Sequence, residues 1–102
     1  MGALYNYFLM QLKNMPWIRK RHSLDKKTRN EYTRILLYFA RMVERKFRLK
    51  SAFELTQDHY AWYINHLTRR GLKRSTINKH KSVLKQAFKA LNIHITVKIR
   101  RV

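Results

Sequence analysis

The chain contains no cysteine, only two glycines and a single proline among its 102 residues. Without cysteine it can form neither a disulfide framework nor a zinc site built on thiolates, and a reducing cytoplasm suits it. The scarcity of glycine and proline leaves few residues for tight turns, which favours long helices over a sheet. The composition therefore predicts one small, all-α domain.

Long hydrophobic runs are also lacking, since no apolar stretch approaches the length of a membrane span. The N-terminal segment MGALYNYFLMQL is apolar, but it has no basic region and no small-residue cleavage site, so we do not predict a signal peptide. We expect residues 3–14 to form a helix of the core. The alternative is a membrane-surface helix, which Lys13 alone would attract to anionic lipid.

Acidic residues are scarce. Five aspartates and glutamates stand against 24 lysines and arginines, which gives a formal net charge of +19. A surface built for solubility usually mixes both signs, and so large an excess of one sign repels itself in the folded state. The imbalance favours a polyanionic partner, of which nucleic acid is the commonest.

No group of residues suggests catalysis or metal binding. The five acids are scattered, and no glycine-rich phosphate loop is present. None of the histidines has the spacing typical of metal ligands; they are His22, His59, His66, His80 and His94. We therefore expect no catalytic residue, no cofactor and no metal in this chain.

Apolar residues recur at helical spacing in four segments. We expect helices near residues 3–14, 25–46, 57–69 and 76–91, with boundaries uncertain by about two to four residues. The longest carries an apolar stripe of Tyr32, Ile35, Leu36, Phe39, Met42, Val43 and Phe47. Arginines occupy its other face.

The start of the longest helix has two interpretations. Thr28 and Glu31 fit a capping box, whereas Ser23 and Asp25 would begin the helix a turn earlier. The preceding stretch WIRKRHS is predicted to be a basic connector after Pro16, which ends the first helix or follows its end.

The later helix boundaries have clearer signals. Thr56 is expected to cap the third helix, Gly71 to follow its end, and Ser75 to cap the fourth. Asn92 suits a left-handed residue after the fourth helix. The remaining segment, IHITVKIRRV, alternates apolar and polar residues and suggests an extended strand without a partner.

Bases crowd the start of the fourth helix, in the stretch RRGLKRSTINKHK of residues 69–81. The positive end of the helix dipole makes bases mildly unfavourable there. The free N–H groups of a helix start bind phosphate, however, and nearby bases would concentrate it. Beyond this point Asn78, Lys79 and Ser82 lie on the exposed face, where a helix in a major groove meets base edges.

Several short motifs follow one another in a defined order within residues 4–92, through SLDKKTRNEYTRILLYFARMVE and LTQDHYAWYINHLTRRGLKRSTINKHKSVLKQAFKALN. Their defining positions are Thr28, Tyr32 and Phe39, then Leu55, Thr56, Tyr63, Ile64, Leu67 and Gly71, then Ser75, Thr76, Ile77, Asn78, Leu84 and Phe88. The order and spacing of these motifs resemble the N-terminal core-binding domain of tyrosine recombinases, the phage-integrase family.

This resemblance implies a SAM-like orthogonal four-helix bundle that packs against double-stranded DNA. In the family this domain and a catalytic domain clamp the recombination site, with the second and fourth helices of the bundle facing the major groove. The DNA contacts implied are Lys26, Lys27, Arg29, Asn30 and Arg34 in the second helix, and Lys73, Arg74, Ser75, Thr76, Asn78, Lys79 and Ser82 at the fourth.

The family's catalytic domain would follow the fourth helix, but the sequence ends at Val102. The His-x-x-Arg pattern of His66 and Arg69 lies inside the third predicted helix, so we interpret it as coincidence. We expect a binding domain in residues 1–92 and a tail or linker in 93–102, as an excised fragment or a truncated gene product. In isolation it should be a monomer, and only the full-length recombinase, encoded by a phage or mobile element, should oligomerise on DNA.

Two other classes of binder remain open at this stage. A small ribosomal-type RNA-binding protein would have the same charge and size, although the aromatic residues mostly fall on core stripes and are not free to stack on unpaired bases. A membrane-active cationic protein would use residues 3–14 and bind anionic vesicles.

Overall fold

The computed structural model describes residues 2–19 and 25–93, and within them every regular element is helical. The chain forms the α-helices α1 (Ala3–Gln11), α2 (Pro16–Arg19), α3 (Lys26–Phe47), α4 (Gln57–Arg69) and α5 (Arg74–Ala90). Two 3-10 turns, Leu12–Asn14 and Ala52–Glu54, lie between them. The predicted all-α bundle is confirmed.

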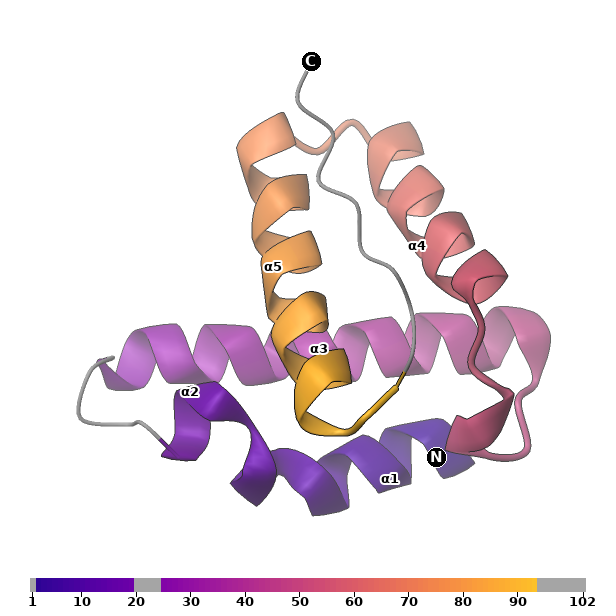
Figure 1. The fold of residues 1–102 in the computed structure, drawn as a ribbon. Coiled ribbons are helices and arrows are strands. Elements are labelled where there is room, and N and C mark those ends of the chain that lie inside the picture. Colours follow the sequence, from indigo (N-terminus) through magenta and orange to yellow (C-terminus); the bar gives the residue numbers. More distant parts are fainter. Residues whose placement is uncertain (1, 20–24, 94–102) are drawn as a thin grey trace.

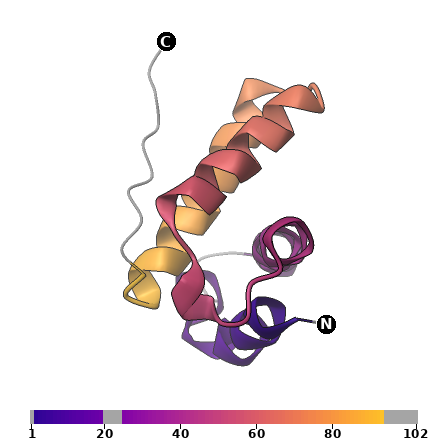
Figure 2. The same cartoon turned by 90° about the vertical axis from the view of Figure 1, so that its right-hand side faces the viewer.

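The helices form two layers that cross each other (Figure 1). Helices α1 and α3 lie side by side and antiparallel in one layer. Helices α4 and α5 form an antiparallel pair that stands across α3, and Figure 2 shows this pair from the side. The N-terminal end of α3 and one flank of α5 thereby come to the same side of the molecule.

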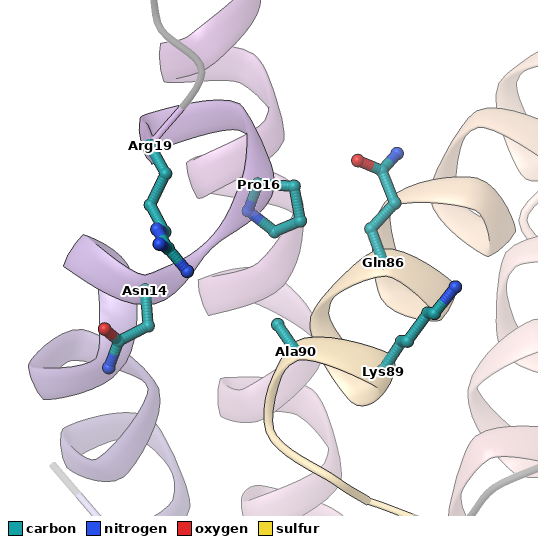
Figure 3. Close-up of a pocket in the computed structure, with 6 residues that line it drawn as sticks. All are labelled: Asn14, Pro16, Arg19, Gln86, Lys89 and Ala90. Atoms are coloured by element: carbon teal, nitrogen blue, oxygen red, sulfur yellow. The ribbon is translucent and has the colours of Figure 1, made fainter.

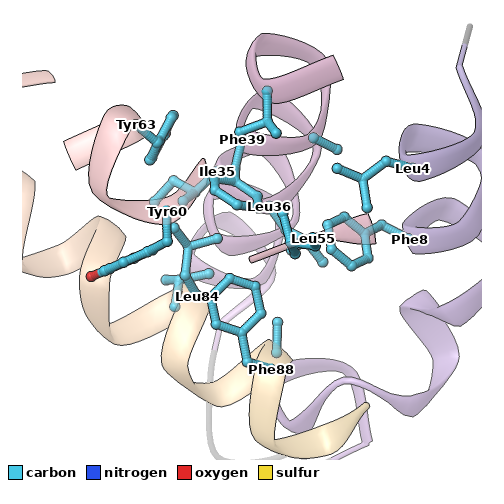
Figure 4. Close-up of a cluster of buried hydrophobic side chains, with 14 of the residues drawn as sticks. Leu4, Phe8, Ile35, Leu36, Phe39, Leu55, Tyr60, Tyr63, Leu84 and Phe88 are labelled. Carbon is cyan, nitrogen blue, oxygen red and sulfur yellow. The ribbon is translucent and has the colours of Figure 1, made fainter. Parts of the chain in front are cut away.

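The core lies where the two layers cross, with Phe39 of α3 at its centre (Figure 4). Its ring meets Tyr63 edge-on at 4.9 Å between centroids, and lies 5.7 Å from Phe88 and 6.4 Å from Phe8. These aromatic residues come from α1, α4 and α5, so a single side chain of α3 joins the four long helices. Such tilted and edge-on pairs add to the stabilisation from burial.

The short helix α2 is packed against α3 and is not a simple connector. Trp17 is buried, its indole N–H donates to Thr33 Oγ1 at 3.1 Å, and its ring meets Tyr32 edge-on. Met15 is fully buried beside it. The prediction of a connector was wrong for residues 17–19. The indole of Trp17 packs on α3, and a helix of four residues is too short to show a periodic apolar pattern in the sequence. Pro16 occupies the first helical position, which suits its fixed φ.

The structure decides between the two predicted starts of the longest helix and corrects the start of the last one. The N-cap of α3 is Asp25, whose carboxylate accepts from Thr28 N–H at 2.7 Å, so the earlier start is the observed one and Thr28 and Glu31 do not form the capping box. The N-cap of α5 is Lys73, and Ser75 lies inside the first turn. The sharp turn before α5 accounts for this second case, because the chain returns to helical geometry at Arg74, three residues after Gly71.

The predicted helix ends at Gly71 and Asn92 are confirmed. Gly71 has φ +78°, its N–H donates to Thr68 O, and the N–H of Leu72 donates to Leu67 O. Asn92 has φ +57° and makes the equivalent bonds at the end of α5. Both are left-handed endings of the kind that glycine and asparagine favour. The strand expected in the tail lies outside the described residues, apart from Ile93.

Candidate nucleic-acid interface

The first turn of α5 is open to an anion. Lys73 precedes it with an extended backbone and makes no side-chain capping bond, and Ile77 N–H is the first to bond back, to Lys73 O. The N–H groups before Ile77 therefore have no capping side chain at Lys73 to satisfy them. Lys73, Arg74 and Ser75 are all exposed around this turn. Backbone donors and two cations in one place suit a phosphate group.

A polar stripe continues along α5 from this turn. It lies opposite the buried positions Val83, Leu84, Ala87 and Phe88, and it contains Ser75, Asn78, Ser82, Lys85 and Lys89. Ser82, Lys85 and Lys89 are exposed, and Asn78 is half-buried. No acid occurs anywhere in α5, so nothing on this helix repels a polyanion.

The first turns of α3 form a second basic surface. Lys26, Lys27, Asn30 and Arg34 line a shallow hollow of about 640 Å³, together with Glu31. Their spacing of three and four residues places them on one face of the helix. Arg29 does not line the hollow and is half-buried, so it stands apart from the other residues predicted on α3.

An ion pair joins the two basic surfaces. Lys79 Nζ of α5 lies 2.8 Å from Glu31 Oε1 of α3, and it is the one ion pair within residues 2–19 and 25–93. The hydrogen bond and charge of Lys79 lower the pKa of Glu31, and the same bond raises the pKa of Lys79. Lys79 thus lies among the α3 residues, but its charge is already balanced by a carboxylate.

His80 faces the core and not the polar stripe. Its Nδ1 lies 2.8 Å from the hydroxyl of Tyr63. Burial, and then the charge of Lys79, lower the pKa of His80, so the ring is neutral near pH 7. Burial raises the pKa of Tyr63, which keeps its hydroxyl protonated and able to donate to that ring. His80 therefore adds no positive charge to the basic stretch that contains it.

Four of the five carboxylates accept hydrogen bonds within the fold. Asp25 caps α3, Glu31 pairs with Lys79, Glu44 accepts from the first N–H groups of α1, and Glu54 accepts from Lys50 N–H. The fifth, Asp58, lies in the first turn of α4, where the helix dipole favours an acid. The few acids are thus placed at structural positions, and the polar stripe of α5 has none.

The structure gathers most, but not all, of the predicted contact residues. Those at the start of α3, except Arg29, lie in one hollow, and Lys79 reaches it from α5. Lys73, Arg74 and Ser75 gather at the first turn of α5. Thr76 is half-buried, whereas Ser75 is exposed.

A further hollow was missed by the sequence analysis. It lies between α2 and the last turns of α5, has a volume of about 750 Å³, and is lined by Asn14, Pro16, Arg19, Gln86, Lys89 and Ala90 (Figure 3). Lys89 and Gln86 belong to the polar face of α5, which was visible in the sequence. Nothing in the sequence indicated that Arg19 would face them, because that depends on the docking of Trp17.

Other kinds of site find no support in the described residues. Within them no three His, Asp or Glu side chains come together as a metal ion would need. No helix in the described ranges has the length and apolar character to cross a bilayer. In α4, the rings of His66 and Trp62 stack with their centroids 5.3 Å apart. In α1, Leu4 and Phe8 are buried, as expected for a helix of the core and not for one on a membrane surface.

Comparisons with known proteins agree with this architecture. The family model of the phage integrase N-terminal SAM-like domain matches residues 11–92, well over half of the chain. No curated protein and no solved structure is significantly similar to the chain. The match spans α3, α4 and α5, which carry both basic surfaces. The chain belongs to the phage integrase N-terminal SAM-like domain family.

Proposed function

We propose that this chain binds double-stranded DNA as the core-binding domain of a tyrosine recombinase, and that with the catalytic domain of a full-length protein it clamps the recombination site. The observation that carries the proposal is the pair of adjacent basic surfaces, one at the start of α3 and one along α5, within a chain of net charge +19. In this proposal residues 1–92 form the DNA-binding domain and residues 93–102 lead toward the catalytic domain.

The two surfaces suit different parts of a duplex. The exposed cations Lys73 and Arg74 and the open N–H groups of the α5 start fit the phosphate backbone, which supplies affinity without sequence information. Asn78 and Ser82 lie further along α5, and the polar stripe has no lysine or arginine between these two residues. An asparagine can make two hydrogen bonds to adenine in the major groove. Lys26, Lys27, Asn30 and Arg34 border the same region from α3.

The salt dependence of binding tests the electrostatic part. If the isolated chain contacts about five to eight phosphates, log K against log salt should have a slope of roughly −4.5 to −7 on duplex DNA. A slope near zero would contradict the proposal. A competition between duplex DNA and RNA of equal length and charge separates DNA binding from the RNA alternative, and preferential binding of the RNA would favour that alternative.

Substitutions on α5 separate phosphate contacts from base contacts. Lys73→Ala should weaken binding to all duplexes alike and reduce the steepness of the salt slope by about one unit. Asn78→Ala should leave the slope unchanged and narrow the difference between the native recombination site and random duplex by about 1–3 kcal/mol. A changed slope for Asn78→Ala, with the site preference retained, would make Asn78 a backbone contact.

The proposal assigns no chemistry to this chain. The tyrosines Tyr60 and Tyr63 are buried, and burial raises the pKa of each hydroxyl, which is unsuitable for a nucleophile. Because the proposal places catalysis in a separate domain, incubation with a nicked duplex that traps covalent intermediates should yield no protein–DNA adduct. An adduct through any tyrosine would overturn this assignment.

A further inference from the structure

The hollow between α2 and α5 lies at the opposite end of α5 from Lys73 and Arg74. Arg19 and Lys89 contribute one cation each from its two sides, and Asn14 and Gln86 contribute amides (Figure 3). Both cations are exposed. All five acids of the chain lie within the described residues, and none of them pairs with either cation.

Arg19 is held in place by the packing of its own short helix. Trp17, two residues earlier, is 1% exposed and hydrogen-bonded to Thr33, and Met15 is fully buried. The position of α2 beside α5 is therefore set by the core, and the hollow does not depend on a flexible side chain alone. A site supported by buried neighbours needs less ordering when a ligand binds.

The polar stripe of α5 has cations toward each end and short polar side chains between them. Lys73 and Arg74 lie at one end, and Lys85 and Lys89 with Arg19 at the other. Between them the stripe presents Asn78 and Ser82, while Lys79 is paired with Glu31 and Lys81 is half-buried off the stripe. Short polar groups suit base edges, whereas unpaired cations suit phosphates.

The length of α5 fits this pattern to a duplex. Its 17 residues span about 25 Å at a rise of roughly 1.5 Å per residue, whereas the major groove of B-DNA is about 12 Å wide. If its axis lies across the groove with its middle facing the bases, the helix extends past both edges. Its two ends then lie near the phosphates of opposite strands.

We infer that the hollow lined by Arg19, Gln86 and Lys89 is a second phosphate-binding site, which holds the backbone of one DNA strand while Lys73 and Arg74 hold the other. The inference rests on the proposed function, because it assigns a strand to each end of a DNA-binding helix. The ligand is a phosphodiester of B-form DNA.

The first experiment measures salt slopes on a random 20-bp duplex, long enough for about two helical turns. The double variant Arg19→Gln/Lys89→Gln should flatten the slope by about two units, one for each phosphate that the variant no longer neutralises. The matched control Arg45→Gln/Lys46→Gln removes the same charges from the far end of α3 and should change the slope far less. The charge-retaining variant Arg19→Lys/Lys89→Arg should keep the slope, and thermal melts should confirm that every variant is folded.

The second experiment asks whether the two ends bind opposite strands. On the normal duplex, the effects of Arg19→Gln/Lys89→Gln and Lys73→Gln/Arg74→Gln should add. On a duplex in which one whole strand is an uncharged methylphosphonate, only one end of α5 can face the charged strand. Either double variant alone should then change the slope little, because the protein can bind with its other end facing the charged strand. The quadruple variant should lose the part of the slope that the ends of α5 contribute.

The outcomes separate the two proposals. If the wild-type chain binds duplex DNA steeply but Arg19→Gln/Lys89→Gln behaves like the control pair, the second site is wrong and DNA binding stands. Additive effects on the half-neutral duplex would place both ends on the same strand and also overturn the inference. A wild-type slope near zero on normal duplex would instead refute the proposed function, and the second site with it.

Discussion

At the scale of single residues, Glu31 limits the attraction of Lys79 for a polyanion, because its carboxylate neutralises the ammonium group. Their side chains lie 2.8 Å apart, and the carboxylate sits within the hollow formed by Lys26, Lys27 and Arg34. A phosphate that approaches Lys79 therefore meets a negative charge beside it. Both groups are exposed, so the pair contributes little to the stability of the fold.

Replacing Glu31 by Gln should strengthen DNA binding. Lys79 would be free to neutralise a phosphate, and the salt slope should become steeper by up to about one unit. Glu54→Gln is the matched control, because it removes the same charge from the Ala52–Glu54 turn, away from α5. Equal gains for both variants would mean that only net charge matters, and would contradict a specific role for Glu31.

His80 should make the stability of the fold depend on pH. Burial, and then Lys79, lower the pKa of His80 from its ordinary value of 6.5, so the unfolded chain binds a proton more readily than the folded chain. This contribution to stability is fully present above about pH 6.5 and is lost as the pH falls toward the lower pKa of the folded state. Protonation also makes Nδ1 a donor, so it can no longer accept from Tyr63.

The variant His80→Gln should flatten this dependence. Chemical denaturation between about pH 7 and pH 5 should show a smaller loss of unfolding free energy for the variant than for the wild type. The pKa values of Asp25 and Glu31 are also lowered, but from ordinary values of 3.8 and 4.5, so these groups affect stability at lower pH than His80 does. The variant should leave the loss of stability in that more acidic range unchanged. An identical slope in both proteins near pH 6 would show that His80 does not titrate in this range.

At the scale of elements, α1 begins with a cap that another helix supplies. Gly2 has no side chain to offer, and the carboxylate of Glu44 on α3 accepts from the N–H groups of Leu4 and Tyr5 at 2.9 and 3.0 Å. Arg41 of α3 lies over the ring of Tyr5 at 5.6 Å. The start of α1 is thus tied to α3 by a carboxylate and a cation–π contact.

Loss of this cap should destabilise the fold measurably. Glu44→Ala should lower the free energy of unfolding by about 1 kcal/mol, the usual effect of losing a helix cap. Gly2→Ala should also be destabilising, because its Cβ would collide with the Glu44 carboxylate. In the Glu44→Ala background the same glycine substitution should have little effect, and urea titrations of the four proteins would measure this coupling. Additive losses would contradict the shared contact.

The long helices were predictable and the short elements were not. The apolar stripe that contains Ile35, Leu36 and Phe39 and the turn at Gly71 are signals of local sequence, so α3, α4 and α5 agree with the expected ranges to within about two residues. Helix α2 depends on the docking of Trp17 on α3, and a four-residue segment has no measurable periodicity. The start of α5 is set by the turn at Gly71 and lies before Ser75, although serine is a favourable N-cap residue.

At the scale of the whole molecule, the fold depends on one junction between its layers. Phe39 is 0% exposed and contacts aromatic rings from the other three long helices, whereas Phe53 is 94% exposed on the Ala52–Glu54 turn. A domain of this size has a total stability of only about 5–15 kcal/mol. A cavity at the junction would therefore remove a large part of it.

Truncating these two phenylalanines should give very different results. Phe39→Ala should lower the free energy of unfolding by about 3–5 kcal/mol, because it leaves a cavity between four helices that cannot all shift to fill it. Phe53→Ala should change it by less than about 0.5 kcal/mol. Denaturant unfolding followed by circular dichroism measures both. A cost for Phe39→Ala as small as that for Phe53→Ala would show that the layers do not depend on this residue.

The sequence by itself determined the helical class, the four long apolar stripes and the strong positive charge, because composition and periodicity are local properties. It also indicated Lys73, Arg74, Asn78 and Ser82 as candidate contacts, and these remain proposals. The tertiary structure decided which charges lie together: Lys79 faces Glu31, His80 turns inward to Tyr63, and Arg19 lies across a hollow from Lys89. Such pairings join residues far apart in the chain, and only the packing of α2, α3, α4 and α5 against one another brings them within reach.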